Sequence, residues 1–482
     1  MNLASLLDAS RLALLRRRLR VRLPGAPVNG LLSISLDLGP GDAHWLNVDL
    51  ARTDVNWWAR PSGSDLPDAG TGGQVRPPGD YRLALGSAMS FSTAGAARFA
   101  ALQAAFSGLA PLWQHDDCQQ TGALPAAHFG FAFDEESRDA LPNARLVVPA
   151  ILLQSRAGCR TASFTCAVRE GESATERWLA ELRAATPQGD SPPPWTAVCR
   201  RREPLADQAF LARARAALAA IASGSLDKLV LARSVHFDGK TPITPGPVLA
   251  ALAHRHPECV IYAVGHHRQC FIGATPERLV SLRGGLVRAD ALAGTAWLAV
   301  APAAGQPISL ALQHDKNRRE QQLVVDAVRD ALAPVCAALA PPQAAEIVQL
   351  RDLQHLRTRV VGRLQAGVGL FDLIARLHPT PAVGGAPGGT AARWLRSHGD
   401  RRGAWYSGGI GWIERDGDGE AVVALRCARI SGCAAELFAG AGIVAGSDPA
   451  QELAETEAKL AVVAEALQRP RRVACHEGSR SA

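Results

Sequence analysis

The sequence of 482 residues predicts an α+β sandwich, in which helices pack on large sheets. Two observations lead to this expectation. Strand-like apolar stretches are long and numerous, and helical stretches lie among them without the regular strand–helix alternation of a doubly wound sheet. No internal repeat is evident. The length is compatible with two or three domains or with one continuous core.

The amino-terminal part, residues 1–195, consists of short strands separated by turns rich in glycine and proline. A typical strand covers 31–36, and one helix is predicted at 96–106. Near the start, a run of arginines at 16–18 follows a short amphipathic segment, which predicts a basic helix. The proline-rich segment 186–194 is the best candidate for a linker.

The second part, residues 205–467, contains longer elements. Strands are predicted at 228–236, 259–264, 270–273, 408–412, 421–425 and 434–439. Helices are predicted at 206–223, 315–333 and 450–467. The helix at 315–333 is amphipathic and ends before Pro334, and its predicted inner face comprises Leu323, Val324, Val325, Val328 and Leu332. The remaining residues, 468–482, predict a basic, disordered tail.

Composition excludes several classes of protein. No stretch of about 18 apolar residues occurs, which argues against a membrane-spanning helix, and the amino-terminal charges are in the wrong order for a secretory signal. Ten cysteines without a Cys-x-x-Cys pair predict a reduced, cytoplasmic protein. The net charge is +7, but the arginines are dispersed rather than gathered in a stripe. We therefore expect an anionic small-molecule substrate, with no nucleic-acid or membrane partner, and a monomer or weak dimer.

Lysine is scarce in this chain, which has four lysines and 48 arginines. Arginine replaces an ordinary surface lysine at little cost, but its guanidinium group does not release a proton in proteins. A surviving lysine therefore indicates a position where an amine must exchange a proton or a compact charge must fit. Lys228, Lys316 and Lys459 lie in motif-bearing segments. Lys240, in contrast, lies in a sequence typical of a solvated turn.

Two predicted helices carry glutamates that could meet. Glu320 lies near the start of the helix at 315–333, whereas Glu452 and Glu455 are three residues apart on one face of the last helix. Carboxylates from two helices, without a His or Cys pattern, suit a hard cation such as Mg²⁺. Spacing alone favours a solvated helix face, with Glu455 and Lys459 paired at i, i+4.

A glycine-rich stretch at 438–447 follows the predicted strand at 434–439 and precedes the last helix. Its backbone N–H groups could approach an anion near a helix start. It lacks both the Lys-Ser/Thr ending of a P-loop and the spacing of a dinucleotide fingerprint, which argues against a nucleotide site. A tight structural turn is the alternative interpretation.

Taken together, these segments resemble the chorismate-binding enzymes and, within them, the isochorismate synthases. The resemblance covers about 205–467 and is only loose before residue 200. The matching segments, in chain order, are KLVLAR (228–233), FIGATPERL (271–279), ALAGT (291–295), KNRRE (316–320), QHL (354–356), LHPTPAVGG (377–385), WY (405–406), ALR (424–426) and 438–459. The resemblance implies a sandwich of two large, mostly antiparallel sheets flanked by helices.

The resemblance also implies catalytic and metal-binding roles. Lys228 would act as the general base that activates water for attack at C2 of chorismate. Glu277 would be the general acid that protonates the departing C4 hydroxyl. Glu320 and Glu455 would hold Mg²⁺, supported by Glu452.

Substrate-binding roles follow from the same resemblance. Arg426 and Tyr406 would bind the enolpyruvyl carboxylate, assisted by backbone N–H groups around Gly440 and Gly442. The residues implied to line the ring or support the carboxylate are Gly294, Thr295, His378 and Lys459.

Elementary chemistry agrees with these roles. Chorismate is a dianion, so its site needs cations and not apolar walls alone. Hydroxide is a poor leaving group and water is a poor nucleophile, so the reaction needs an acid at C4 and a base at C2. A lysine can supply that base, whereas an arginine cannot.

The sequence departs from the family pattern at Asp290, Gln321 and Gly388, and none of these changes removes a proposed catalytic atom. The motifs leave open a salicylate synthase, which would go on to eliminate pyruvate from isochorismate. Anthranilate and aminodeoxychorismate synthases fit less well, because they usually lack a lysine at position 228. A non-catalytic anion-binding protein is a further alternative. The pathway that uses the product, whether towards menaquinone, a siderophore or salicylate, also stays open.

Overall fold

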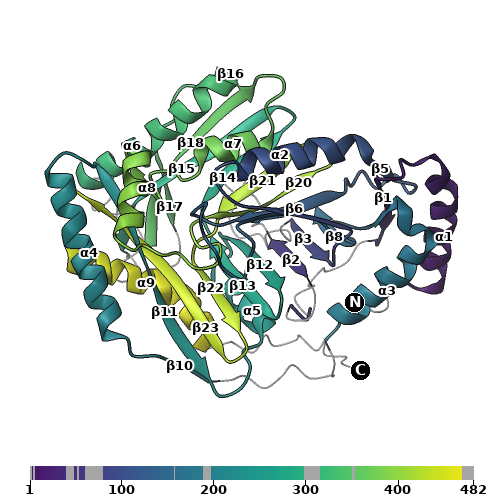
Figure 1. Cartoon of the computed structure of the whole chain (residues 1–482), viewed down its shortest axis with the longest axis horizontal. Helices are drawn as coiled ribbons and strands as arrows, with labels where there is room; N and C mark the ends of the chain where they lie inside the picture. The colour runs from purple at the N-terminus through teal and green to yellow at the C-terminus, as the bar shows by residue number, and fades with distance from the viewer. Residues whose placement is uncertain are drawn as a thin grey trace, which may run out of the picture.

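The computed structural model describes most of the chain as one α+β sandwich (Figure 1). The described residues are 3, 6–39, 48–50, 54–59, 80–156, 158–187, 197–297, 315–349 and 353–468, without the side chains of 295–297, 315–317 and 353. The linker candidate and the tail at 469–482 lie almost wholly outside these residues. No described helix combines the length and apolar character needed to cross a bilayer.

The first sheet joins both parts of the sequence. Among the described residues its strands are, in spatial order, β10 (Val198–Arg200), β11 (Lys228–Gly239), β23 (Ala434–Val444), β22 (Cys427–Ser431), β13 (Gln269–Thr275), β12 (Val260–His266), β2 (Val55–Ala59), β3 (Tyr81–Leu85), β8 (Ile151–Arg156), β9 (Cys159–Ala167), β1 (Leu31–Asp37) and β5 (Trp113–Asp116), with β19 (Gly385–Ala386) beside β11. All its pairings are antiparallel except that of β1 with β5.

The second sheet is antiparallel and is likewise shared. Its described strands are β16 (Cys336–Leu339), β18 (Leu353–Leu364), β15 (Leu286–Trp297), β14 (Arg278–Arg283), β21 (Gly419–Val423), β20 (Gly409–Glu414), β6 (Ala126–Phe131), β7 (Ala144–Val148) and β4 (Met89–Thr93), with β17 (Glu346–Gln349) beside β18. The amino-terminal part therefore completes both sheets, joining the first at β2–β12 and the second at β6–β20.

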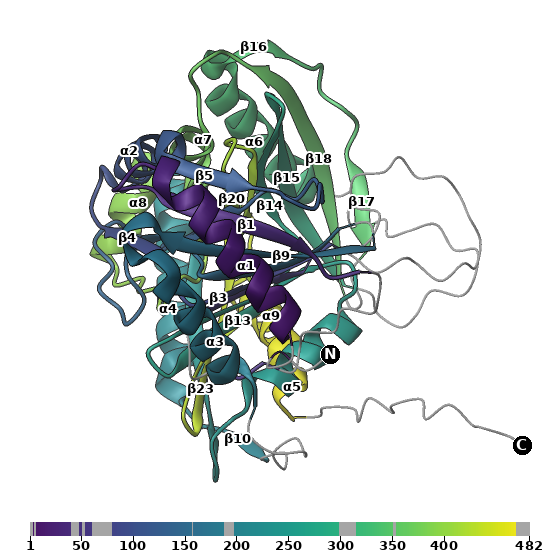
Figure 2. The ribbon, with the colours of Figure 1, turned by 90° about the vertical axis from the view of Figure 1, so that its right-hand side faces the viewer.

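Helices cover the outer faces of the two sheets (Figures 1 and 2). The first sheet packs against α1 (Ala9–Arg22), α3 (Ala174–Ala185), α4 (Pro204–Ala222), α5 (Pro245–Arg255) and α9 (Pro449–Gln468). The second sheet packs against α2 (Arg98–Leu109), α6 (Asp315–Leu332) and α7 (Leu370–Leu377), and α8 (Gly388–Ser397) contacts β19 and β11. A third apolar layer, which includes Trp58, Tyr262 and Trp412, fills the space between the sheets.

Most of the predicted elements are present, with shifts at their ends. The helix at 315–333 corresponds to α6, although Leu323 is only half-buried, whereas Val324, Val328 and Leu332 are fully buried. Lys240 is exposed in a bend after β11, as predicted. The prediction of a single helix at 96–106 in the region after the basic helix was incomplete, because α3 also forms there. Trp178 and Leu182 of α3 are buried against the first sheet.

Candidate active site

Strands β11 and β23 form the base of the site. They pair in an antiparallel register that runs from Lys228 opposite Val444 to Asp238 opposite Ala434. Lys228 is the first residue of β11, and its side chain is only 1% exposed. A buried lysine side chain requires polar partners, and this one donates a hydrogen bond to Glu320 of α6. The sequence therefore places its first candidate residue at a point where a strand, a helix and a cavity meet.

A pocket of about 720 Å³, measured out to its mouth, opens beside this pair. Its walls come from both sheets, from α6 and from α9. Ten of the thirteen predicted site residues line it, namely Lys228, Glu277, Gly294, Glu320, Tyr406, Arg426, Gly440, Gly442, Glu455 and Lys459.

Glu277 is the buried acid of the pocket, with 4% of its surface exposed. Burial raises the pKa of its carboxyl group to about 7, and the positive charges of Lys228 and Arg426 limit that rise. Asp290, at one of the positions where the sequence departs from the family pattern, contributes to the raised pKa of Glu277. A carboxyl group with a pKa near 7 can donate a proton at neutral pH, as a general acid must.

Two carboxylates reach the pocket from separate helices. Glu320 Oε1 accepts a hydrogen bond from Lys228 Nζ at 2.7 Å, and Glu455 Oε1 lies 2.5 Å from Lys459 Nζ. Among the described residues, no three His, Cys, Asp or Glu side chains approach closely enough to form a metal site by themselves. Two carboxylates facing a polar pocket nevertheless fit Mg²⁺, which commonly takes one or two protein carboxylates and completes its shell with water and substrate oxygens.

The glycine-rich stretch is strand rather than turn, which corrects the prediction that the strand ends near residue 439. Residues 438–444 continue β23 opposite β11, while the pairing with β22 stops at Phe438. The N–H groups of Val230 and Ala232 bond away from β23, to Gly384 O and Asp400 Oδ2. In an antiparallel ladder, their partners Gly442 and Gly440 must then also direct their backbone groups away from β11.

Glycine is needed here because neighbouring atoms approach closely. A Cβ atom at Gly442 would lie 3.0 Å from Glu320 Oε1 and 3.2 Å from Lys228 Cε. A Cβ atom at Gly440 would lie 2.8 Å from the Tyr406 hydroxyl. Lys459 Nζ donates to the carbonyl oxygen of Gly440 at 2.9 Å, on the edge of β23 that β22 has left.

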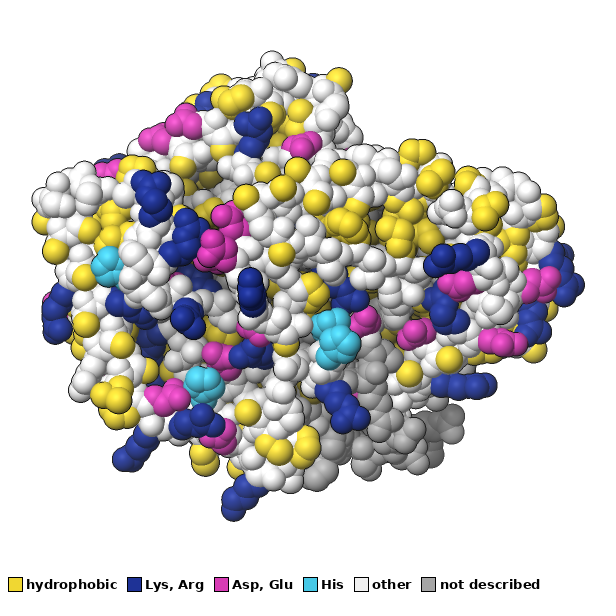
Figure 3. Space-filling view, viewed as in Figure 1, with side chains coloured by type: hydrophobic (Ala, Val, Ile, Leu, Met, Phe, Trp, Pro, Cys, Tyr) yellow, Lys and Arg dark blue, Asp and Glu magenta, His cyan; other side chains and the backbone are white. Residues whose placement is uncertain are grey.

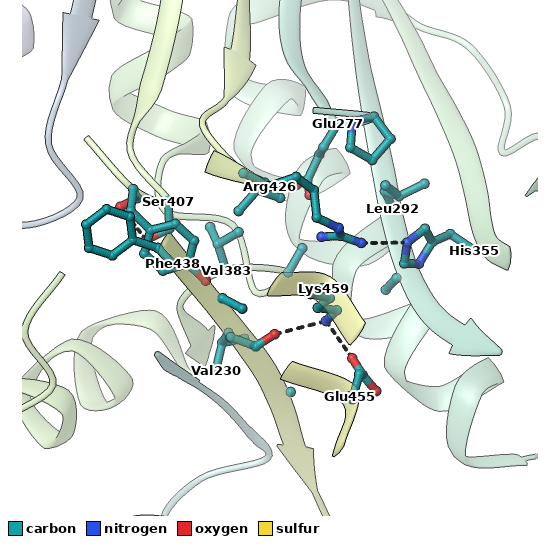
Figure 4. A pocket seen from close by; sticks show the side chains of 18 of the residues that line it. Val230, Glu277, Leu292, His355, Val383, Ser407, Arg426, Phe438, Glu455 and Lys459 are labelled. Carbon is teal, nitrogen blue, oxygen red and sulfur yellow. Dashed lines mark hydrogen bonds and ion pairs between the residues drawn. The ribbon is translucent and has the colours of Figure 1, made fainter. Parts of the chain in front are cut away.

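Arg426 also lines the pocket and supplies a positive charge to it (Figure 4). The residue is 8% exposed and has a left-handed backbone, with φ of 49°. Its Nε–H group is buried and has no hydrogen-bond partner among the described residues. A buried donor of this kind is costly when unpaired, so a pocket with such a donor is suited to an anionic ligand.

Comparison with known proteins agrees with this geometry. Residues 76–468 match the family model described as "Chorismate binding enzyme". The chain belongs to this family. It is 34% identical over 372 residues to isochorismate synthase MenF of Bacillus subtilis (strain 168), covering 75% of this chain and 78% of the relative. It is 39% identical over 254 residues to the salicylate biosynthesis isochorismate synthase of Pseudomonas aeruginosa, covering 52% of this chain and 53% of the relative.

The fold is also known from solved structures. The menaquinone-specific isochorismate synthase MenF from Escherichia coli superposes with a TM-score of 0.73, covering 95% of this chain and 99% of that one at 23% identity. This likeness confirms the predicted sandwich of two mostly antiparallel sheets flanked by helices.

Three predicted site residues of this chorismate-binding enzyme are not among the described residues that line the pocket. His378 lies behind the wall, where its Nε2 contacts the Ser407 carbonyl oxygen at 2.9 Å and burial lowers its pKa to about 3. Glu452 is 3% exposed on α9 and does not line the pocket. The backbone of Thr295 belongs to β15, but its side chain lies outside the described residues. His378 thus contacts Ser407, which lines the pocket, and does not line it itself.

Several lining residues received no role from the sequence, among them His355 and Arg402. His355 of β18 contacts Arg426 and Gly294, and the QHL segment that contains it was the only signal available. Nothing in the sequence indicated a role for Arg402. Its buried guanidinium group donates to the carbonyl oxygens of Val383 and Val230, each at 2.7 Å, so it ties together two walls of the pocket.

Proposed function

We propose that this chorismate-binding enzyme is an isochorismate synthase, which reversibly adds water at C2 of chorismate and releases the C4 hydroxyl, with Mg²⁺ as cofactor. The observation that carries the proposal is the joint presence of Lys228 and Glu277 in one buried pocket. The reaction needs a base and an acid that act on different carbons of the same ring. One lysine and one carboxyl group with a raised pKa meet that need.

The protons and the hydroxyl group balance as follows. Lys228 takes a proton from the attacking water while the oxygen forms its bond to C2. Glu277 gives a proton to the C4 oxygen, the two ring double bonds shift, the C4–O bond breaks and water leaves. The reverse reaction uses the same two groups with exchanged roles. No ammonia and no organic cofactor enter, because water is both the nucleophile and the leaving group.

Glu320 and Glu455 are the residues that would hold Mg²⁺. The cation, when bound, supplies positive charge to the ring carboxylate of the substrate. These two side chains are suited to that task because both are only partly exposed at the mouth of the pocket, where their exposed fractions are 15% and 19%. Lys459, beside Glu455, adds a second positive charge for an anionic substrate.

The enolpyruvyl carboxylate would bind at the part of the pocket wall formed by Arg426 and Tyr406. Arg426 offers its unpaired Nε–H group there, and Tyr406, stacked on Phe438 with ring centroids 5.5 Å apart, adds a hydroxyl group. Burial raises the pKa of this hydroxyl group, so it stays protonated and can donate a hydrogen bond. Two carboxylates of the substrate would thus meet two separate sources of positive charge.

We also infer a cytoplasmic protein that acts on a small molecule and not on nucleic acid. All nine cysteines among the described residues are free thiols, which is typical of a reducing compartment. On the face shown in Figure 3, basic side chains are scattered among acidic ones and do not form one continuous stripe. A nucleic-acid surface typically gathers such charges.

Product analysis tests the proposed reaction. Purified protein should convert chorismate to isochorismate when Mg²⁺ is present, and the same protein should convert isochorismate back to chorismate. Liquid chromatography separates the two compounds and also detects salicylate and pyruvate. Accumulation of salicylate and pyruvate as main products would instead assign the protein as a salicylate synthase. An absence of turnover in both directions would contradict both assignments.

A further inference from the structure

We propose that His355 is a positioning residue, a fixed neutral hydrogen-bond acceptor that orients Arg426 for the carboxylate of the substrate. This inference rests on the proposed function, because it assigns a purpose to the carboxylate-binding arginine. His355 lies in β18 and lines the pocket beside Arg426 (Figure 4).

The two contacts of the imidazole ring determine where its proton lies. Arg426 Nη2 is 3.2 Å from His355 Nε2, and His355 Nδ1 is 3.3 Å from the Gly294 carbonyl oxygen. An arginine can only donate, so Nε2 must accept and therefore carries no proton. The proton of the neutral ring is then on Nδ1, where it is donated to Gly294. Each ring nitrogen thus has a partner that agrees with a single tautomer.

The surroundings keep the ring neutral. Burial is the main cause that lowers the pKa of His355 to about 3; the charges of Arg426 and Lys459 act in the same direction, whereas the charge of Glu455 and the hydrogen bond to Gly294 oppose it. Residue exposure is only 5%. Around neutral pH the ring therefore neither gains nor loses a proton. It is unsuited to general acid or base catalysis and suited to holding a donor in place.

The backbone around His355 is arranged for this contact. Strand β15 has a bulge between Ala293 and Thr295, so that Ala293 pairs with Leu356 and Thr295 pairs with His355. Gly294, the extra residue, has φ of 68°, a value that glycine adopts readily. The bulge leaves the Gly294 carbonyl oxygen without a ladder partner in the β15–β18 register and places it within reach of the His355 ring.

The contact matters because Arg426 has few other restraints. No other hydrogen bond to its guanidinium group is found among the described residues, and its Nε–H is unpaired. When one nitrogen of a guanidinium group is held by a hydrogen bond, its remaining N–H donors keep a fixed direction. Without His355, the guanidinium group would lose the bond that fixes its rotation.

Two substitutions separate the two contacts of the ring. His355→Gln can place an amide oxygen near the position of Nε2 and so keeps an acceptor for Arg426. His355→Asn places its amide near Nδ1, which keeps the contact to Gly294 but removes the acceptor. Both variants are neutral and polar, so they form a matched pair. Circular dichroism and melting temperatures establish whether each is folded.

Kinetics with chorismate then give the decisive comparison. We expect His355→Asn to raise KM about tenfold or more, the effect of losing one charge-assisted hydrogen bond. Its kcat should change much less, because a carboxylate that takes no part in bond making or breaking is bound similarly in the ground state and the transition state. His355→Gln should recover most of the loss. Equal impairment of both folded variants, or a fall in kcat without a change in KM, would overturn the proposal.

A spectroscopic measurement on the free protein does not depend on turnover. Nitrogen-15 NMR of the imidazole ring should show Nδ1 protonated and Nε2 unprotonated, unchanged between about pH 5.5 and 9, a range well above the lowered pKa of a buried histidine. A ring that titrates in this range, or that carries its proton on Nε2, would overturn the role proposed for His355. Failure of wild-type protein to act on chorismate, with the tautomer as expected, would instead contradict the proposed function and leave the contact in place.

Discussion

Lys228 Nζ lies 2.7 Å from Glu320 Oε1, so the predicted base and a predicted metal ligand share one contact. The two residues are 92 positions apart in the chain and come from β11 and α6. The same carboxylate oxygen can neutralise the ammonium group or bind a cation. The proposed base and the proposed metal site are therefore coupled through Glu320, and substitutions at either position should affect catalysis before they affect folding.

Lys228→Arg keeps a positive charge beside Glu320 but removes the amine. We expect turnover to fall by about 10²-fold or more, the usual scale of general-base catalysis. KM should change little, because Arg426 and the metal are proposed to anchor the substrate. Steady-state kinetics measure both quantities. Lys240→Arg, in an exposed bend, is the control and should leave turnover unchanged. Wild-type turnover in Lys228→Arg would show that Lys228 acts only as a fixed charge.

Glu320→Gln and Glu455→Gln each remove one anionic oxygen from the mouth of the pocket. Both should abolish Mg²⁺-dependent turnover, because a hard cation then loses one of its two protein carboxylates. Both side chains are partly exposed, so the melting temperature should change by only a few degrees. Titrating Mg²⁺ into activity assays checks the prediction. Near-normal activity of either variant at low Mg²⁺ would exclude that residue as a ligand.

The pH dependence of kcat/KM should follow the protonation of the Glu277 carboxyl group. Its pKa is raised to about 7, and the acid must be protonated to donate, so kcat/KM should be lost progressively as the pH rises above about 7. Glu277→Gln has no acidic proton and should lower turnover by ~10²–10⁴-fold. The exposed Glu176 of α3 is the matched control, and Glu176→Gln should keep the wild-type profile. A wild-type profile that stays flat as the pH rises from about 6 to 9 would contradict this assignment.

Gly442→Ala should damage the site more than the fold. The added Cβ would lie 3.0 Å from Glu320 Oε1 and 3.2 Å from Lys228 Cε, so the Lys228–Glu320 pair must shift. We expect turnover to fall at least about tenfold, because small displacements of reacting groups are costly in catalysis. Gly108→Ala in α2 is the control, because Gly108 is exposed and a Cβ atom added there would meet no atom within 4 Å. This control should keep full activity and gain up to about 1 kcal/mol of stability.

The amino-acid sequence by itself determined which residue types could carry the chemistry. Lys228 stands out because lysine is rare in this chain, and the period of the apolar residues located α6 and α9 to within a few residues of their ends. The sequence did not reveal that the glycines at 440 and 442 continue β23. Glycine is a poor strand former on average, and here the strand depends on pairing with β11 and on side chains that occupy the space a Cβ would need.

Only the tertiary structure decided which candidates reach the pocket. Glu452 and Glu455 are three residues apart, a spacing that places both on one general face of a helix. Three residues nevertheless rotate the side chain by about 60°, and the packing of α9 on β23 directs Glu455 into the pocket and buries Glu452 elsewhere. The pKa of Glu277 and the contact between Arg426 and His355 depend in the same way on burial between two sheets. Local sequence determines periodicity and residue chemistry, whereas burial and distance arise only when segments far apart in the chain pack together.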